Sequence, residues 1–140
     1  LLHLLVGLKN KITFTSLLIQ KEVAQKILEE APDANYLSVF LGTFFEIKIV
    51  SFVEKECFNP VPEVDGAIIT FKTKKESLIK DENIERYSKF LHHGFREQRK
   101  MLNKRFEKKL LETCGIDSTR RAETLTIEEW VKLFERFYAD

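Results

Sequence analysis

The sequence predicts an α+β protein in which the strands come first and the helices follow. Three runs rich in β-branched and aromatic residues lie within residues 1–74, as is typical of strands. After residue 83 the apolar residues recur at helical spacing alone. The chain has 140 residues, of which 44% are hydrophobic and 32% charged. This is the composition of a globular protein and not of a disordered one.

The first part of the chain is expected to alternate short helices with one strand. Residues 1–8 read as a helix end that is too short to cross a bilayer. Residues 12–19 predict a strand that becomes apolar on both faces, as a buried strand is. A short helix should follow from Gln20 and end at Ala31-Pro32, since proline does not continue a helix. Asp33 is expected to cap the next helix. The buried stripe of that helix is predicted to contain Leu37, Phe40, Leu41 and Phe44.

Two further strands are predicted to form an antiparallel hairpin. They cover residues 46–53 and 64–72, and a loop that contains prolines joins them. The polar stretch that follows lacks periodicity and is typical of a linker. The predicted domain organisation is therefore a sheet domain over residues 1–74, a linker over 75–83 and a helical domain over 84–140.

The helical domain is predicted to hold three helices. The last has the clearest start, because Thr126 and Glu129 have the spacing of a capping box, with Leu125 and Trp130 around it as a hydrophobic staple. Gly115 is expected to end the second helix. The residues predicted to face the core are Ile84, Tyr87 and Leu91 in the first helix, Leu102, Phe106 and Leu110 in the second, and Trp130, Leu133, Phe134 and Phe137 in the third.

Charge is distributed unevenly although the net charge is only +1. All seven arginines follow residue 83, and residues 86–109 hold nine basic residues against two acidic ones. If the second helix is continuous, Lys100, Lys104 and Lys108 recur every four residues on one flank, with Arg96 and Arg99 near their line. Such a flank suits the phosphates of a nucleic acid, because neutralising them releases counterions. A solvated helix face is the alternative interpretation.

Several classes of site and location are disfavoured by the sequence. Two cysteines 57 positions apart and three histidines do not supply a structural zinc cluster, so no metal is expected. The five glycines are scattered, so there is no glycine-rich loop for a dinucleotide or phosphate. With two cysteines and no export segment, a cytoplasmic location is expected. The chain opens Leu-Leu-His and its only methionine is Met101, so we expect a fragment.

The loop before the third strand is the most unusual segment of the chain. Pro60 and Pro62 each fix a backbone angle, so the loop should be stiff and extended. Phe58 immediately precedes this rigid section and could present its ring as a stacking surface for a planar ligand. Alternatively, Phe58 plugs the core, as many aromatic residues beside turns do. Asp65 is assigned a structural role in pinning the loop.

The residues from Phe58 to Ala67 resemble the Phe-x-Pro-x-Pro-x-Val-Asp-Ser-Ala signature of the small-subunit ribosomal RNA adenine dimethyltransferases. The erythromycin-resistance rRNA methylases share part of this signature. Four other stretches resemble motifs of the same family in the same order. They are Gln20–Ala24, Tyr36–Val39, Phe95–Lys100, and Gly115–Asp117 taken together with Arg121–Leu125.

This resemblance implies a function and a fold. Family members transfer methyl groups from S-adenosylmethionine to the exocyclic amines of adjacent adenines near the 3′ end of small-subunit rRNA, during ribosome biogenesis. Phe58 would be the catalytic-site phenylalanine that stacks on the target base. Residues expected to bind rRNA are Arg96, Arg99, Lys100, Lys104 and Lys108. The fold implied is the last strands of a class I methyltransferase α/β sheet, followed by a small all-helical C-terminal domain.

The chain departs from the family pattern in ways that limit what it can do. It lacks the family's Asn-(Leu/Ile)-Pro-Tyr loop and its Gly-x-Gly cofactor loop, so S-adenosylmethionine would bind to an N-terminal part outside this chain, and the fragment alone would be inactive. Gly66 stands where the family usually has serine, and Gln98 where it usually has arginine. The first strand should then lack a neighbour and expose its edge.

Two other interpretations are open. In one, the chain is a binding module of the same family that contacts rRNA or the small ribosomal subunit without catalysis. In the other it is a generic α+β domain, for which replacing Arg99, Lys100 and Lys104 with alanine would leave RNA affinity unchanged.

Overall fold

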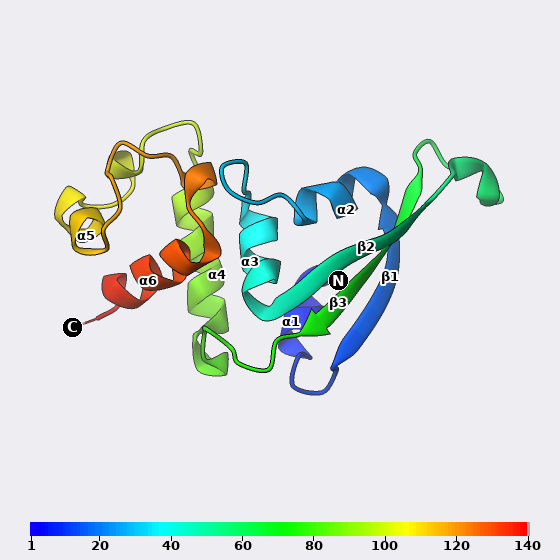
Figure 1. Cartoon of the computed structure of the whole chain (residues 1–140), viewed down its shortest axis with the longest axis horizontal. Coiled ribbons are helices and arrows are strands. Elements are labelled where there is room, and N and C mark those ends of the chain that lie inside the picture. Colours follow the sequence, from blue (N-terminus) through cyan, green and yellow to red (C-terminus); the bar gives the residue numbers. More distant parts are fainter. Residues whose placement is uncertain (140) are drawn as a thin grey trace.

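The computed structural model describes residues 1–139 and confirms the α+β fold class (Figure 1). The three strands lie within residues 14–73, and the chain is helical from residue 84 onward apart from turns and one isolated bridge. The helices are α1 (Leu2–Gly7), α2 (Lys21–Ile27), α3 (Tyr36–Phe44), α4 (Ile84–Phe95), α5 (Lys108–Thr113) and α6 (Ile127–Phe137); the strands are β1 (Phe14–Gln20), β2 (Phe45–Val53) and β3 (Gly66–Thr73).

The three strands form one antiparallel sheet in the order β1-β3-β2. The predicted hairpin of β2 and β3 is confirmed, with Ile49 opposite Ile69. Strand β1 pairs with the other side of β3, where Leu17 lies opposite the same Ile69. Residues that lie opposite one another share a face of the sheet. Ile69 is buried, so this pair of contacts marks the face that packs against the core.

The sequence predicted that strand β1 is buried on both faces, and this prediction is wrong. Within residues 1–139 it pairs with β3 alone, and the outer face of the sheet leaves Phe14 58% and Leu18 52% exposed. The alternation of exposed and half-buried residues along β1 is that of a strand covered on one side only. The expectation that this strand lies at an edge of the sheet is confirmed in the described residues.

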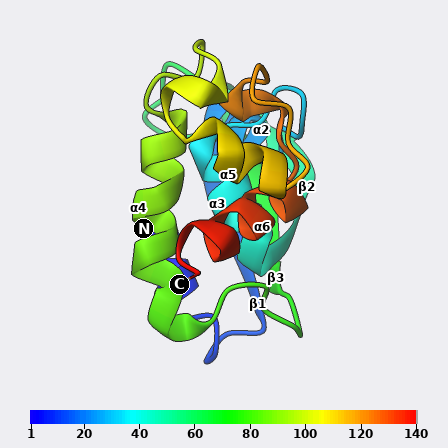
Figure 2. The same cartoon turned by 90° about the vertical axis from the view of Figure 1, so that its left-hand side faces the viewer.

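Helix α3 connects the sheet to the C-terminal helices. Figures 1 and 2 show it between the sheet and the group formed by α4, α5 and α6. Phe40, Leu41 and Phe44 of α3 are buried as predicted, and Tyr87 of α4 packs against the rings of Phe40 and Phe44. The hydroxyl groups of Thr43 and Tyr87 lie 2.9 Å apart and hydrogen-bond inside this contact.

The buried residues form one cluster that reaches from the sheet to α6. Ile79, within the predicted linker, is buried too, and its carbonyl oxygen accepts a hydrogen bond from the Ser77 hydroxyl at 2.5 Å. The predicted linker thus contributes a residue to the shared core. The division of the chain into two domains at residues 75–83 stays a prediction.

Asp33 does not cap α3, so that prediction is wrong. The N-cap is Asn35, whose side-chain oxygen accepts a hydrogen bond from the Ser38 N–H at 3.0 Å. The Ser38 hydroxyl oxygen in turn accepts a hydrogen bond from the Asn35 N–H at 3.0 Å. This reciprocal pair satisfies two backbone donors, and asparagine is as good a cap as aspartate. Asp33 instead lies exposed in the preceding turn.

The predicted second C-terminal helix, which would have carried Lys100, Lys104 and Lys108 on one flank, does not exist as one element. Between α4 and α5 the chain forms turns and a short 3-10 turn at Leu102–Lys104. The N–H groups of Leu102 and Asn103 donate to the carbonyl oxygens of Arg120 and Ser118 at 2.8 and 3.1 Å, so tertiary hydrogen bonds replace those of a helix. Repulsion among closely spaced cations also disfavours a continuous helix.

The last helix follows its prediction except at its end. Thr126 and Glu129 form the capping box, with Leu125 and Trp130 both buried. Gly115 ends α5 with φ +73°, a conformation that glycine adopts without strain. The Phe137 ring faces the core as predicted, with its centroid 5.3 Å from that of Phe90, but it is 45% exposed because α6 ends at this residue.

Candidate nucleic-acid interface

Residues 54–65 form an arm that extends beyond the end of the sheet (Figure 1). Its base is held by Asp65, whose carboxylate accepts a hydrogen bond from the Lys55 N–H at 2.9 Å. The Asp65 carbonyl oxygen accepts a second bond, also 2.9 Å, from the Lys21 N–H at the start of α2. These contacts give Asp65 the structural role expected from the sequence: the first joins the two ends of the arm, and the second ties the arm to α2.

Phe58 lies half-buried on the arm, with its ring against the first residue of β3. A Cβ atom on Gly66 would lie 3.3 Å from Phe58 Cζ and 3.1 Å from Leu18 Cδ1. The glycine thus lets the ring approach the backbone of β3 closely on the outer face of the sheet. The ring is neither sealed in the core nor fully exposed, so one part of it remains available to a ligand. Its role in stacking stays a prediction.

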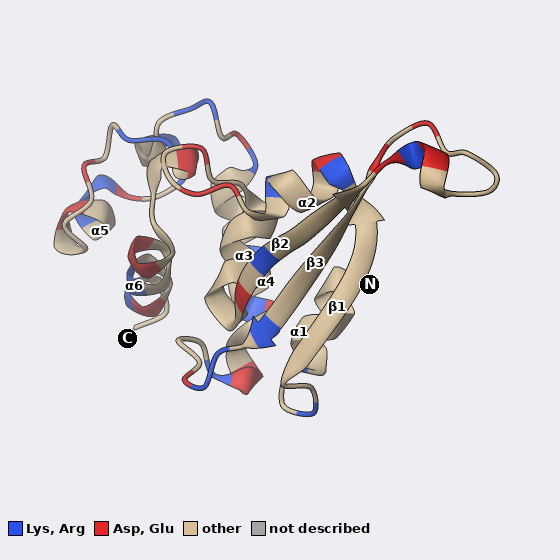
Figure 3. Ribbon diagram, turned by 45° about the vertical axis from the view of Figure 1, so that its right-hand side comes forward, with Lys and Arg blue, Asp and Glu red and all other residues tan. Residues whose placement is uncertain are grey.

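The five residues predicted to bind rRNA lie around the loop that leaves α4 and the start of α5. Figure 3 shows Lys and Arg along this part of the chain. All five are exposed. Lys100 pairs with Glu97 at 2.8 Å and Lys108 with Glu112 at 3.7 Å. Among residues 1–139, Arg96, Arg99 and Lys104 have no ion-pair partner and are the better candidates for binding phosphate.

The structure does not bring Phe58 and these cations together. The arm lies at one end of the long axis of the molecule and α5 lies at the other (Figure 1). A nucleic acid that touches both must therefore extend along the molecule.

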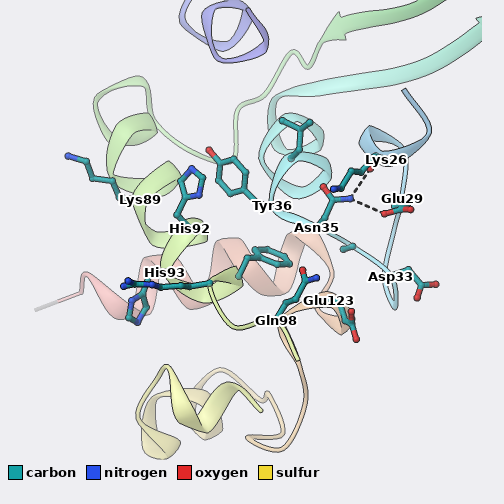
Figure 4. Close-up of a pocket in the computed structure, with 14 residues that line it drawn as sticks. Lys26, Glu29, Asp33, Asn35, Tyr36, Lys89, His92, His93, Gln98 and Glu123 are labelled. Carbon is teal, nitrogen blue, oxygen red and sulfur yellow. Dashed lines mark hydrogen bonds between the residues drawn. The ribbon is translucent and has the colours of Figure 1, made fainter. Parts of the chain in front are cut away.

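A groove of about 950 Å³ lies between α3 and α4, and sequence reasoning did not identify it. Figure 4 shows the Tyr36 and His92 rings side by side there, and their centroids lie 3.7 Å apart. The Tyr36 hydroxyl oxygen lies 2.7 Å from both His3 Nε2 and Ser88 Oγ. The rim is mixed in charge, with Lys26, Glu29, Asp33, Lys89, Arg96 and Glu123. The feature of the sequence that points to this groove is the stretch Tyr36–Val39, which resembles a family motif and begins at Tyr36.

The pKa values of two groups at this junction, His3 and Tyr36, are shifted toward the neutral form. Burial lowers the pKa of His3, and the nearby His92 lowers it further. Burial also raises the pKa of Tyr36, although the hydrogen bond to Ser88 opposes this. Neutral rings can stack and hydrogen-bond without paying for desolvation of charge. The cluster therefore joins α1, α3 and α4 as a structural contact.

Residues 1–139 hold neither a clustered metal site nor a membrane-spanning helix. No group of three or more His, Cys, Asp or Glu side chains is placed to hold a metal ion in this part of the chain. None of the helices described is both long and apolar enough to pass through a bilayer.

Comparison with protein families gives one clear match. The model of the family "Ribosomal RNA adenine dimethylase" matches residues 4–139. The relative from Sulfurihydrogenibium sp., "Ribosomal RNA small subunit methyltransferase A", is 37% identical over 125 residues, which is 88% of this chain and 48% of the relative. The protein of the same name from Persephonella marina is 36% identical over 137 residues, which is 94% of this chain and 52% of that protein. The chain spans about half the length of these relatives.

Solved structures agree with these relatives. The "23S rRNA methyltransferase ErmE" is 25% identical with a TM-score of 0.63, and the match covers 89% of this chain and 55% of that one. A dimethyladenosine transferase from Plasmodium falciparum has the same fold, with a TM-score of 0.77 at 21% identity over 94% of this chain and 60% of that one. The ordered motifs, the sheet with its arm and the family match over residues 4–139 together place this chain in the ribosomal RNA adenine dimethylase family.

Proposed function

We propose that this chain is the C-terminal, RNA-contacting half of an rRNA adenine dimethyltransferase. The intact enzyme would transfer methyl groups from S-adenosylmethionine to the exocyclic amines of adjacent adenines near the 3′ end of small-subunit rRNA, in the immature small ribosomal subunit. The observation that carries this proposal is the arm, which holds the half-buried Phe58 ring on the first residue of β3. Because the chain belongs to the ribosomal RNA adenine dimethylase family, the ligand of this ring would be the target adenine.

In this proposal Phe58 supports the target base after it leaves the RNA stack. An adenine amine is a poor nucleophile because its lone pair is delocalised into the ring, so the base has to be extruded and held in line with the methyl donor. A ring held by a stiff arm fixes the plane of the base at little entropic cost. Arg96, Arg99 and Lys104, with Lys100 and Lys108, would bind the phosphates at the far end of the molecule.

The methyl donor does not fit the residues of this chain. The sequence lacks a glycine-rich loop, so neither the groove between α3 and α4 nor a second groove, lined by α3, the start of β2, the loop after α2 and the start of α6, contains one. We therefore assign the binding of S-adenosylmethionine to the part of the enzyme that this chain does not cover, and we expect the chain by itself to be inactive. Cys57 and Cys114 are both free, which fits a reducing cytoplasm.

The test is a methyl-transfer assay on the complete protein that contains this chain. Radiolabelled S-adenosylmethionine and small ribosomal subunits that lack the modification are the substrates. We expect label in adenines near the 3′ end of the rRNA, and no label when the 140-residue chain is used alone. Absence of transfer by a complete protein that binds S-adenosylmethionine would contradict the proposal.

A non-catalytic RNA-binding module is the second candidate, and the cations without ion-pair partners favour it. A filter-binding assay run beside the transfer assay separates the two. A complete protein that binds the subunit tightly but transfers no methyl group would support the binding module.

A further inference from the structure

A second aromatic ring lies at the same end of the sheet as Phe58, and a cation lies over it. Phe52 of β2 is 51% exposed, and Lys21 Nζ lies 5.0 Å from the centroid of its ring. Among residues 1–139, Lys21 has no ion-pair partner. An exposed ring beside a cation that no carboxylate neutralises is the combination that binds single-stranded nucleic acid, through stacking and charge.

The register of the sheet places the two rings on opposite faces of one strand end. Phe58 lies against Gly66, which faces the outer side of the sheet together with Leu18. Phe52 lies opposite Ala67, the next residue of β3, and successive residues of a strand point to opposite faces. The two aromatic side chains therefore lie beside the first two residues of β3, on opposite faces of the sheet.

The charge of the arm determines which part of an RNA can approach it. Residues 54–65 contain four acidic residues and one lysine, so phosphates are repelled from the arm and uncharged bases are favoured. A nucleotide bound at the arm needs a cation outside it for its phosphate. Lys21 is at the right place, because its backbone N–H donates to the Asp65 carbonyl oxygen and so holds this residue at the base of the arm. Figure 3 shows the start of α2 beside this base.

We propose that Phe52 and Lys21 form a subsite for the nucleotide next to the target adenine, with the Phe52 ring stacking on its base and the Lys21 ammonium binding its phosphate. This inference rests on the proposed function, since it needs an RNA whose target base lies at Phe58. It assigns the neighbouring nucleotide to the core-facing side of the sheet end and the target base to the outer side.

The test uses the complete protein and a hairpin RNA with two adjacent adenines in its loop. Affinity is measured by fluorescence anisotropy over a series of salt concentrations, and the methyl-transfer rate is measured on the same RNA. We expect Lys21→Gln to weaken binding about fivefold. It should also reduce the magnitude of the slope of log K against log salt by about 1, because one phosphate contact is lost. Phe52→Ala should weaken binding about tenfold without changing that slope, and Phe52→Tyr should bind like the parent.

Matched controls come from the other end of the sheet. Phe14→Ala removes a ring of similar exposure, and Lys72→Gln removes an exposed lysine opposite it in the register. Both should leave affinity and slope unchanged. The inference is overturned if Lys21→Gln keeps the parental slope, or if Phe52→Ala binds like Phe14→Ala while circular dichroism shows both folded. If the parent binds RNA with the expected variant effects but transfers no methyl group, the proposed enzyme activity fails and the subsite stands.

Discussion

Close packing around single residues decides where the core of this protein can change. Gly94 of α4 lies against the Trp130 ring, so that a Cβ atom added there would come within 2.7 Å of Trp130 Cζ3. Trp130 is completely buried among the rings of Phe90, Phe95 and Phe106 and has little freedom to move. Glycine is therefore required at this position by close approach, although alanine would be a better helix former.

We predict that Gly94→Ala lowers the free energy of unfolding by about 1–3 kcal/mol, because the added methyl group overpacks the core. Urea denaturation followed by circular dichroism measures the change. Gly7→Ala is the control, since a Cβ atom there meets nothing within 4 Å and should leave stability equal or slightly higher. Equal stability of both variants would show that the Trp130 ring can yield.

Helix caps explain the starts of α3 and α6 at the scale of elements. Asn35 and Ser38 cap one helix, and Thr126 and Glu129 cap the other. Asn35 also donates through its Nδ2 atom to the Lys26 carbonyl oxygen at 2.8 Å, which joins α3 to the end of α2. A cap at the junction of two helices fixes their relative position as well as the start of one of them.

Replacing Asn35 with alanine should lower the free energy of unfolding by about 1 kcal/mol, since the Ser38 N–H loses its partner. Asp33→Ala is the matched variant two residues earlier, and it should have no measurable effect. Thermal melts of both proteins distinguish the observed cap from the one that the sequence predicted. A larger loss for Asp33→Ala than for Asn35→Ala would contradict the observed geometry.

Arg120 and Glu129 join the loop before α6 to its first turn, with Nη1 2.5 Å and Nη2 3.0 Å from the two carboxylate oxygens. The bond from Arg120 holds the pKa of Glu129 below its ordinary value of 4.5. A depressed pKa means that the stabilisation is complete above pH 4.5 and is lost as the pH falls through the folded-state pKa. We predict that Glu129→Gln, which can keep the capping box, flattens the decline in melting temperature between pH 5 and pH 3. A parallel decline in both proteins would exclude this contribution.

The sequence predicted elements well where local signals agreed and failed where distant contacts decided. The capping box at Thr126, the β2–β3 hairpin and the glycine at the end of α5 were correct, because each depends on neighbouring residues. The helix through Lys100 and Lys104 was wrong, because the N–H groups of Leu102 and Asn103 bond to residues 18 and 15 positions later. Helical periodicity cannot reveal such pairing.

The candidate site shows the same limit at the scale of the whole molecule. The sequence identified Phe58 and the excess of cations after residue 83, but it gave no information on the separation of the arm from α5. It also missed the groove with Tyr36 and His92, which exists only once α3 and α4 pack together. The sequence did not indicate Phe52 as a site residue, because its exposure depends on which residue of β3 lies opposite it.

The cations gathered between the end of α4 and the start of α5 predict salt-dependent binding to RNA. Replacing Arg96, Arg99 and Lys104 together with glutamine should weaken binding of the complete protein to small-subunit rRNA. The slope of log K against log salt should fall by about 2, since about 0.7–0.9 of a counterion is released per phosphate contact. Lys48→Gln on the sheet is the control. An unchanged slope in the triple variant would show that Arg96, Arg99 and Lys104 do not contact the RNA phosphates.

The central claim is that the Phe58 ring supports an adenine during methyl transfer, and one comparison tests it directly. The initial rate of methyl transfer to unmodified small ribosomal subunits is measured for the complete protein, for Phe58→Ala and for Phe14→Ala. The account predicts a loss of at least about tenfold for Phe58→Ala, as expected for the loss of one base–aromatic stack, and the parental rate for Phe14→Ala. Equal rates for the two variants would contradict it.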